Sequence, residues 1–452
     1  MLKKTDLNKQ GLKDFLYHFF IIWNLLIIAL LIILHFNIRI LRFEKVKIKP
    51  KSLDQWGKFQ LFWKSDKDRQ DIGSFIYSLG IVDLNHDKIK DIIALSSSGT
   101  ISGLNGKNGI SYFAIEQIPP VWHVKIVPGK SPCILLLDAR SNIKCLSDKG
   151  KQLWKIHGAG EMVSFSLAAR KDKGFIMPVN FTKGLLFADT SGKILFQNAS
   201  FNHPLFTEVV TYDFNNDNND DILVGDTRSV YCLDGVTGNI LWYKNVHYLY
   251  PGKFSIINGK DDEVYILVPL YNGNLVVLNK AGVDVWKLDL GENLVDAPVV
   301  YRNKDDEYCF VQSTKSGRMA AFNFSSRDKI WTKDSESSPV KLAVCDFNFD
   351  DAPEVVSISQ NGLVKIINGS DGHTIDSWQA LEHDQENIVS NLVIDDMDND
   401  GNFEITFASD RGNVYVYSYK VFKKFNIWKL FLGKKGKWDF YGGNIKGSSK
   451  FH

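Results

Sequence analysis

The 452-residue sequence is 44% hydrophobic and 23% charged, which is the composition of a globular protein and excludes an intrinsically disordered chain. Lys and Arg together number 54 and Asp and Glu number 52, so the formal net charge is only +2. The chain therefore lacks the broad basic excess with which nucleic-acid-binding proteins neutralise phosphates.

Residues 1–14 form a short basic N-terminal tail, and the segment after it is predicted to span a membrane. Residues 15–38 contain no Asp, Glu, Lys or Arg, and about 20 mostly apolar residues are enough for a spanning helix. Bulky and basic residues follow, instead of the small residues of a signal-peptide cleavage site. We therefore predict an uncleaved signal-anchor helix over 15–38 and a basic stalk over 39–54; a buried core helix is the weaker alternative.

The charges beside this segment leave its orientation ambiguous. Lysines in the N-terminal tail favour a cytoplasmic N-terminus, whereas Arg39, Arg42 and the lysines of the stalk favour the opposite orientation. The orientation is therefore better decided from the chemistry of the large domain that follows.

A repeat of about 45 residues occupies positions 55–445, and residues 446–452 form a C-terminal tail. Each copy has an apolar run, a turn that often contains Gly, an alternating strand and a closing aromatic residue. The closing aromatics are 41 to 50 residues apart, and they are Phe113, Trp154, Phe196, Trp242, Trp286, Trp331, Trp378 and Trp428. This period fits four short strands, the content of one propeller blade.

We therefore predict an all-β protein, a β-propeller of eight blades, with seven as the alternative if one weak repeat fails. Trp63 lies 50 residues before Phe113 and keeps the same phase. Its segment is expected to supply an outer strand to the last blade and so to close the ring. The tryptophans are expected to fill the gaps between blades and not to stack on a ligand.

Two of the five cysteines, Cys133 and Cys145, are placed where neighbouring strands of one hairpin are expected. We expect the cysteines to be buried, small apolar residues, with a Cys133–Cys145 disulfide as the alternative. Five cysteines are too few for a disulfide framework, so they do not decide the compartment.

Four acidic segments share the pattern D-x-[DN]-x-D-x-x-x-[DE], and each is followed at once by an apolar strand. Their candidate ligand residues are Asp83, Asn85, Asp87 and Asp91; Asp213, Asn215, Asp217 and Asp221; Asp346, Asn348, Asp350 and Glu354; and Asp396, Asp398, Asp400 and Glu404. The segments begin 130, 133 and 50 residues apart, or about three, three and one repeats. This spacing predicts loops in blades one, four, seven and eight.

Oxygen ligands at positions 1, 3, 5 and 9 of a tight loop favour Ca²⁺, with a backbone carbonyl at position 7 completing the shell. Zinc and copper are disfavoured because no His or Cys stands at a ligand position. The loops resemble an EF-hand at their start, but the last ligand comes at position 9 and a strand follows. The alternative is a solvated Asx-rich turn that holds no metal.

These features resemble the FG-GAP (or VCBS) repeats of integrin α-subunit heads, and the glycine-containing turns also look like the pyrroloquinoline-quinone-type propeller repeat. The segment 438–444 is similar to a W-x-x-[FY]-x-G-[ND] segment that flanks such propellers. The resemblance implies calcium on one face of the propeller and partners at loops. Calcium sites with a Kd of about 10⁻⁴ to 10⁻³ M fill only outside the cytosol, which favours an extracytoplasmic propeller, whether periplasmic, extracellular or lumenal.

The function predicted from these features is a membrane-anchored, calcium-stabilised and non-catalytic scaffold for a protein or glycan partner. The sequence contains no G-x-S-x-G, no H-E-x-x-H and no histidine cluster, and its histidines, among them His123, are expected in loops or at the surface. One alternative is a quinoprotein dehydrogenase. The other is a membrane-protein assembly factor like the propeller of the bacterial outer-membrane insertion machinery, disfavoured because no cysteine follows the apolar segment for lipid anchoring.

Overall fold

The computed structural model describes residues 58–65, 76–116, 120–129, 131–158, 160–171, 174–199, 201, 203–250, 252–259, 262–335, 340–381 and 386–420. The predicted tail, membrane helix and stalk over 1–54, the segment 438–444 and the C-terminal tail lie outside these residues. Within the described ranges, no helix is long and apolar enough to cross a membrane.

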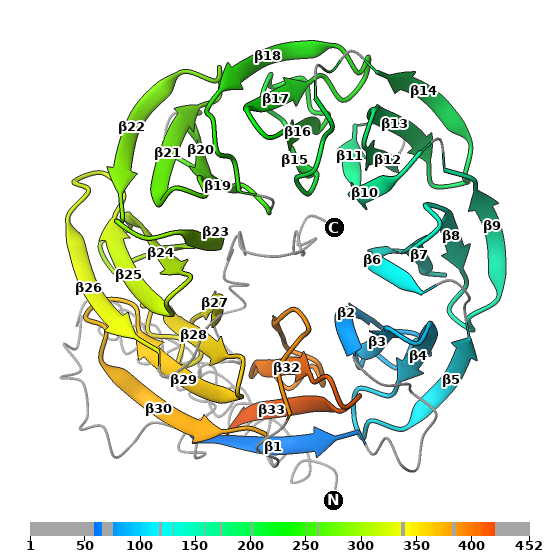
Figure 1. The fold of residues 1–452 in the computed structure, drawn as a ribbon. Helices are drawn as coiled ribbons and strands as arrows, with labels where there is room; N and C mark the ends of the chain where they lie inside the picture. Colours follow the sequence, from blue (N-terminus) through cyan, green and yellow to red (C-terminus); the bar gives the residue numbers. More distant parts are fainter. Residues whose placement is uncertain are drawn as a thin grey trace, which may run out of the picture. The chain divides into compact units, whose positions relative to one another are not determined.

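The described strands form eight antiparallel sheets, and Figure 1 shows the sheets arranged around a common centre. The first four blades consist, in chain order, of β2 (Ile76–Val82), β3 (Asp91–Ser96), β4 (Thr100–Leu104) and β5 (Ser111–Glu116); β6 (Val121–Val127), β7 (Cys133–Asp138), β8 (Ile143–Leu146) and β9 (Gln152–Ile156); β10 (Met162–Phe165), β11 (Ala168–Arg170), β12 (Gly174–Phe181), β13 (Gly184–Asp189) and β14 (Ile194–Asn198); and β15 (Val210–Tyr212), β16 (Asp221–Gly225), β17 (Ser229–Leu233) and β18 (Ile240–Asn245).

The next three blades are built in the same order, with the first strand innermost and the last at the rim (Figure 1). They consist of β19 (Ser255–Asn258), β20 (Val264–Pro269), β21 (Asn274–Asn279) and β22 (Asp284–Asp289); β23 (Leu294–Arg302), β24 (Tyr308–Thr314), β25 (Arg318–Asn323) and β26 (Lys329–Asp334); and β27 (Val340–Cys345), β28 (Glu354–Ser359), β29 (Leu363–Asn368) and β30 (Thr374–Gln379).

The eighth blade joins the two ends of the repeat region. It contains β31 (Val393–Asp395), β32 (Glu404–Ala408), β33 (Val414–Lys420) and, at its outer edge, β1 (Lys58–Lys64). Strand β1 pairs antiparallel with β33, so that Lys58 lies opposite Lys420 and Trp63 opposite Val416. The predicted eight blades and the closure of the ring by the Trp63 segment are both confirmed, and the seven-blade alternative is wrong.

Eight apolar clusters hold the blades together, one at each junction between neighbours. The second strands of the blades are almost wholly buried, as in β3 and β28, because both faces of each sheet are covered by other blades. The rim strands alternate between exposed and half-buried residues, as in β5 and β18. Removal of both apolar faces of each sheet from water is the dominant stabilisation of this arrangement.

The closing aromatics occupy one structural position, as predicted. Those from Phe113 to Trp378 lie in the rim strands β5, β9, β14, β18, β22, β26 and β30, while Trp428 lies outside the described residues. In blade 8, Trp63 on β1 takes the place that the repeat assigns to this aromatic. The rim aromatics pack on the following blade: a Cβ added to Gly192 or Gly282 would meet Trp154 at 2.7 Å or Trp242 at 2.5 Å.

The cysteines differ in part from the expectation. Cys232, Cys309 and Cys345 are buried free thiols, as predicted. Cys133 on β7 and Cys145 on β8 form a disulfide, so the alternative was correct for this pair. The pairing follows from strand register, because Cys145 lies opposite Leu135, two residues from Cys133.

Candidate functional site

The four acidic loops occupy equivalent places in the ring. They join the innermost strand to the second strand of blades 1, 4, 7 and 8, that is β2 to β3, β15 to β16, β27 to β28 and β31 to β32 (Figure 1). The predicted blade positions are confirmed. Successive turns of an antiparallel sheet alternate between the two ends of its strands. All four loops therefore lie at the same end of the strands, on one face of the ring.

The loops share one backbone conformation. Positions 4 and 6 of each loop have a positive φ, between 57° and 85°, and these residues are His86 and Lys88, Asn216 and Asn218, Phe349 and Asp351, and Asn399 and Gly401. Left-handed residues other than Gly are uncommon and Asn or Asp tolerates them best. The recurrence of the pair in four loops shows that the shared sequence pattern specifies a shared structure.

The same hydrogen bonds fix each loop, as loop 1 (residues 83–91) illustrates. The backbone N–H of Lys88 donates to Asp83 at 3.0 Å, that of Asp87 to Asn85 at 3.0 Å, and that of Ile89 to Asp87 at 2.8 Å. The equivalent bonds in the other loops are Asn218 to Asp213, Asp217 to Asn215 and Asn219 to Asp217; Asp351 to Asp346, Asp350 to Asn348 and Ala352 to Asp350; and Gly401 to Asp396, Asp400 to Asp398 and Asn402 to Asp400. These carboxylate and amide side chains therefore stabilise the loop backbone directly.

The carboxylate at position 9 is buried in every loop and serves as an anchor. It accepts the N–H of the apolar residue at position 2, over 2.8 to 3.0 Å, in the pairs Leu84–Asp91, Phe214–Asp221, Phe347–Glu354 and Met397–Glu404. Burial raises the pKa of Asp221 to about 6, that of Glu404 to about 8 and that of Glu354 to about 9, and it also raises the pKa of Asp91. A buried carboxyl group with a raised pKa is one that a nearby cation stabilises in its charged form.

Loop 4 (residues 396–404) brings its carboxylates closest together. Oxygens of Asp396, Asp398 and Glu404 all lie within 4.8 Å of one another, and within the described ranges no other group of three His, Cys, Asp or Glu side chains meets this condition. One oxygen of Asp396, like one of the equivalent Asp83 in loop 1, is buried and has no hydrogen-bond partner among the described residues. These oxygen donors fit the ligand preference of Ca²⁺.

The other three loops differ at position 3, where each has an asparagine. The side-chain N–H of Asn85 donates to Asp87 at 3.0 Å, and that of Asn348 donates to Glu354 at 3.2 Å. These amides bond to carboxylates within the loop itself. The sixteen candidate ligands are thus gathered into the four predicted loops, and loop 4 has the densest carboxylate cluster.

A second group of ionisable residues lies on the innermost strand β6 and in the connections that lead into β15 and β19, where the sequence predicted nothing. Lys253 forms an ion pair with Glu208 at 3.3 Å, and both interact electrostatically with Lys125. Burial, together with the charge of Lys253, lowers the pKa of Lys125 to about 8. His123 lies in β6 and is half-buried, and burial lowers its pKa, so the prediction of a loop position was wrong for this residue.

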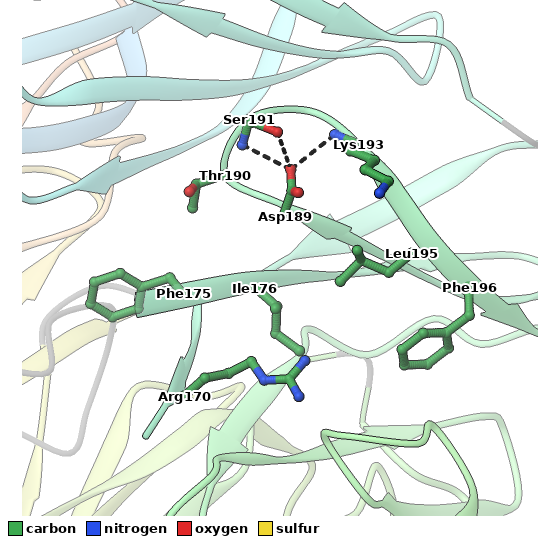
Figure 2. Close-up of a pocket in the computed structure, with 9 residues that line it drawn as sticks. All are labelled: Arg170, Phe175, Ile176, Asp189, Thr190, Ser191, Lys193, Leu195 and Phe196. Carbon is green, nitrogen blue, oxygen red and sulfur yellow. Dashed lines mark hydrogen bonds between the residues drawn. The ribbon is translucent and has the colours of Figure 1, made fainter. Parts of the chain in front are cut away.

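A shallow pocket of about 530 Å³ lies on blade 3, between β11, β12 and the β13–β14 turn (Figure 2). Arg170 and Lys193 line it, together with hydroxyl and apolar side chains. Asp189 is engaged within the turn, where one oxygen accepts hydrogen bonds from Ser191 and from the backbone of Lys193 at 2.6 to 3.0 Å. No His or Cys lines the pocket, and the carboxylate beside the Ser191 hydroxyl also accepts two backbone N–H groups of its own turn.

Several solved structures have a similar fold. BamB from Moraxella catarrhalis is 17% identical, with a TM-score of 0.55 over 80% of this chain and 100% of that chain. The computationally designed Ika8 protein is 14% identical, with a TM-score of 0.59 over 79% and 99%. The Vibrio cholerae biofilm matrix protein Bap1 is 12% identical, with a TM-score of 0.59 over 80% and 91%. The structural similarity shows that these proteins share the propeller fold, and because the sequence identities are low, it shows nothing beyond the fold.

No curated protein matches the sequence. The family PQQ_2, described as outer membrane protein assembly factor BamB, matches residues 139–349 and 251–423. Together these matches span residues 139–423, which is more than half of the chain. The chain therefore belongs to the PQQ_2 family of BamB-type β-propellers.

Proposed function

We propose that the protein is a membrane-associated, non-catalytic scaffold that binds a protein partner and assists the assembly of membrane proteins. The observation that carries this proposal is the family match over residues 139–423. The match favours the assembly-factor alternative over the general binding protein that the sequence alone suggested. A rigid ring with loops on both of its faces suits a scaffold, because the packed blades hold the recognition residues of the loops in place.

The absence of a lipid-anchoring cysteine, which weighed against this function, is accommodated if residues 15–38 form the anchor as a spanning helix. We further propose an extracytoplasmic propeller. The Cys133–Cys145 disulfide supports this location, since disulfides persist in oxidising compartments and are rare in the cytosol. Alkylation of free thiols in intact cells, followed by mass spectrometry, tests it; a reduced Cys133–Cys145 pair would count against it.

We also propose that loop 4 binds Ca²⁺ through Asp396, Asp398 and Glu404. The close approach of their oxygens and the unpaired oxygen of Asp396 support this site. Asp400 and the three other loops complete the predicted set of calcium ligands, with weaker structural support. A bound ion would hold loop 4 in its turn conformation and would have a structural rather than a catalytic role.

The scaffold function is tested by isolating the tagged full-length protein from its native membranes after mild crosslinking. We expect a component of a membrane-protein insertion machinery to be enriched over a control with an unrelated membrane-anchored protein. Recovery of no membrane-protein partner would contradict the proposal. Quinone-dependent dye reduction by the purified protein would instead favour the dehydrogenase alternative.

A further inference from the structure

Two consecutive residues in the connection between blades 4 and 5 adopt an unfavourable backbone conformation. His247 has a φ of 54° and Tyr248 a φ of 55°. For a bulky residue this conformation is a genuine outlier, and such residues persist only where the surrounding structure enforces them, often at functional sites. The Tyr248 side chain is 68% exposed.

Hydrogen bonds from both neighbouring blades hold this connection in place. The N–H groups of Val246 and His247 donate to the carbonyl of Arg228, in the β16–β17 turn, at 2.8 and 3.1 Å. The N–H of Tyr271, in the β20–β21 turn, donates to the carbonyl of Tyr248 at 2.7 Å. The strained segment therefore brings together side chains from two blades at one place.

These side chains form an aromatic surface with a positive charge, which we call the tyrosine patch: Arg228, His247, Tyr248, Tyr250 and Tyr271. Tyr271 is 47% exposed, and its ring stacks on that of Tyr250 with centroids 6.3 Å apart and planes at 14°. Arg228 and His247 are exposed. Tyr and Arg are the residue types most enriched among the dominant contacts of protein interfaces.

Three carboxylates lie close to the patch residues along the chain or in space, and one of them, Asp296, acts on Tyr250 through its charge. Asp226, two residues before Arg228, is fully buried and accepts hydrogen bonds from Arg228, Ser229 and Tyr231. Glu292, which follows the fifth blade, pairs with Arg318 at 2.9 Å. Among the five patch residues, Arg228 carries the permanent charge, and its side chain is exposed.

The patch lies at the opposite end of the strands from the acidic loops. The β16–β17 and β20–β21 turns join second to third strands, whereas the acidic loops join first to second strands. In an antiparallel sheet these two kinds of turn lie at opposite ends of the strands. The described part of the ring begins at Lys58 and ends at Lys420. Their backbones lie opposite each other, at the end of the strands that carries the acidic loops. The patch thus lies on the face of the ring opposite to the face at which the described chain enters and leaves.

We propose that the tyrosine patch is the docking surface for an acidic peptide segment of a protein partner. This inference rests on the proposed scaffold function and names the surface and the chemistry of the partner. Tyrosine rings contribute large, rigid contact areas, and the Arg228 guanidinium recognises carboxylates through paired hydrogen bonds.

The test uses a randomised peptide library, displayed on phage and selected on the purified full-length protein. We expect the selected peptides to be acidic, and their affinity to weaken about tenfold or more in Tyr248→Ala and Tyr271→Ala. Arg228→Gln is expected to weaken them and to remove the salt dependence of binding. Tyr243→Ala is the matched control, since Tyr243 is 64% exposed on the rim strand of the same blade.

Tyr248→Gly separates binding from folding. Glycine adopts a positive φ without strain, so this variant should have a melting temperature equal to or above that of the wild type and yet lose the peptide. Selection of neutral or basic peptides, of none, or of peptides that bind Tyr248→Ala equally well would overturn the proposal. So would binding of oligosaccharides on a glycan array that is lost in Tyr248→Ala without any peptide binding.

The native-membrane crosslinking experiment, repeated with Tyr248→Ala, distinguishes the two proposals. Loss of the partner in the variant supports the patch. If the wild type and the variant recover the same partner, the scaffold function stands and the patch is wrong. If neither recovers a partner, the scaffold function itself fails.

Discussion

The indole N–H of Trp63 donates a hydrogen bond of 2.7 Å to the carbonyl oxygen of Gly106, which lies 43 residues further along the chain. Trp63 belongs to the rim strand of blade 8 and Gly106 to the β4–β5 turn of blade 1, so this bond joins the last blade to the first. The same contact links other neighbours, through Trp242 to Lys280 and Trp331 to Gly369, each at 2.9 Å. A repeated contact between neighbouring blades therefore also closes the ring.

Trp63→Ala should strongly destabilise the propeller. Trp63 is only 8% exposed, and truncation of a buried Trp typically costs about 3–5 kcal/mol. Urea unfolding followed by fluorescence measures the loss. Leu61→Ala, on the same strand but 46% exposed, is the control and should change stability little; equal effects of the two variants would show that Trp63 has no special role in closure.

Gly109→Ala should destabilise the same junction through two separate effects. Gly109 has a φ of 71°, and an added Cβ would lie 2.5 Å from the Trp63 ring. Left-handed strain costs about 1–2 kcal/mol, and overpacking adds about 1–3 kcal/mol. Gly291→Ala isolates the strain, because Gly291 has a φ of 75° with no atom within 4 Å of the added Cβ. Thermal unfolding should rank Gly109→Ala below Gly291→Ala, and the reverse order would contradict the packing argument.

Calcium should stabilise the protein through loop 4. At a calcium concentration ten times the Kd, binding to the folded state alone adds about 1.4 kcal/mol. The melting temperature should therefore rise on replacing EDTA with calcium, and Asp396→Asn and Asp398→Asn should reduce this rise. Asp328→Asn, at an exposed turn of blade 6, should leave it intact. An identical melting temperature in EDTA and in millimolar calcium would disprove a calcium site in the ring.

Lys125→Met should stabilise the protein near neutral pH, and the gain should shrink at alkaline pH. Burial lowers the pKa of Lys125 from 10.5 to about 8 in the folded state. Below about pH 8 the lysine is charged in both states, so the cost of burying its charge is fully present; between about pH 8 and 10.5 the folded state binds fewer protons, and wild-type stability rises relative to the variant.

Melting temperatures of both proteins from about pH 7 to about pH 10 test this pH dependence. The charges of Lys253 and Glu208 act on Lys125, and Lys125 in turn acts on His123. Lys155→Met, at an exposed position of the same blade, is the control and should show no such trend. A constant difference between Lys125→Met and the wild type across this range would mean that Lys125 keeps an ordinary pKa.

Much of the site was predictable because its pattern is local. The residues that fix each acidic loop lie within nine positions, so the spacing of Asp83 to Asp91 already encodes the turn that the structure contains. The same spacing placed the loops in blades 1, 4, 7 and 8. The histidine prediction failed at His123 because its surroundings include Glu208 and Lys253, which belong to other parts of the ring and lie far from it in the sequence, so that no local pattern reveals them.

The sequence by itself determined the propeller fold, the phase of the rim aromatics and the closure by the Trp63 strand, because each blade repeats the same short-range pattern of strands and turns. It favoured eight blades and left seven open, which the structure decided. Only the tertiary structure decided that Cys133 and Cys145 pair, that Lys125 lies near Lys253, and that Tyr248 stands exposed between two blades. These features depend on register and on contacts between residues of different strands or blades. A repeat encodes what its copies share, whereas the features that distinguish one blade junction from the next appear only when the ring is assembled.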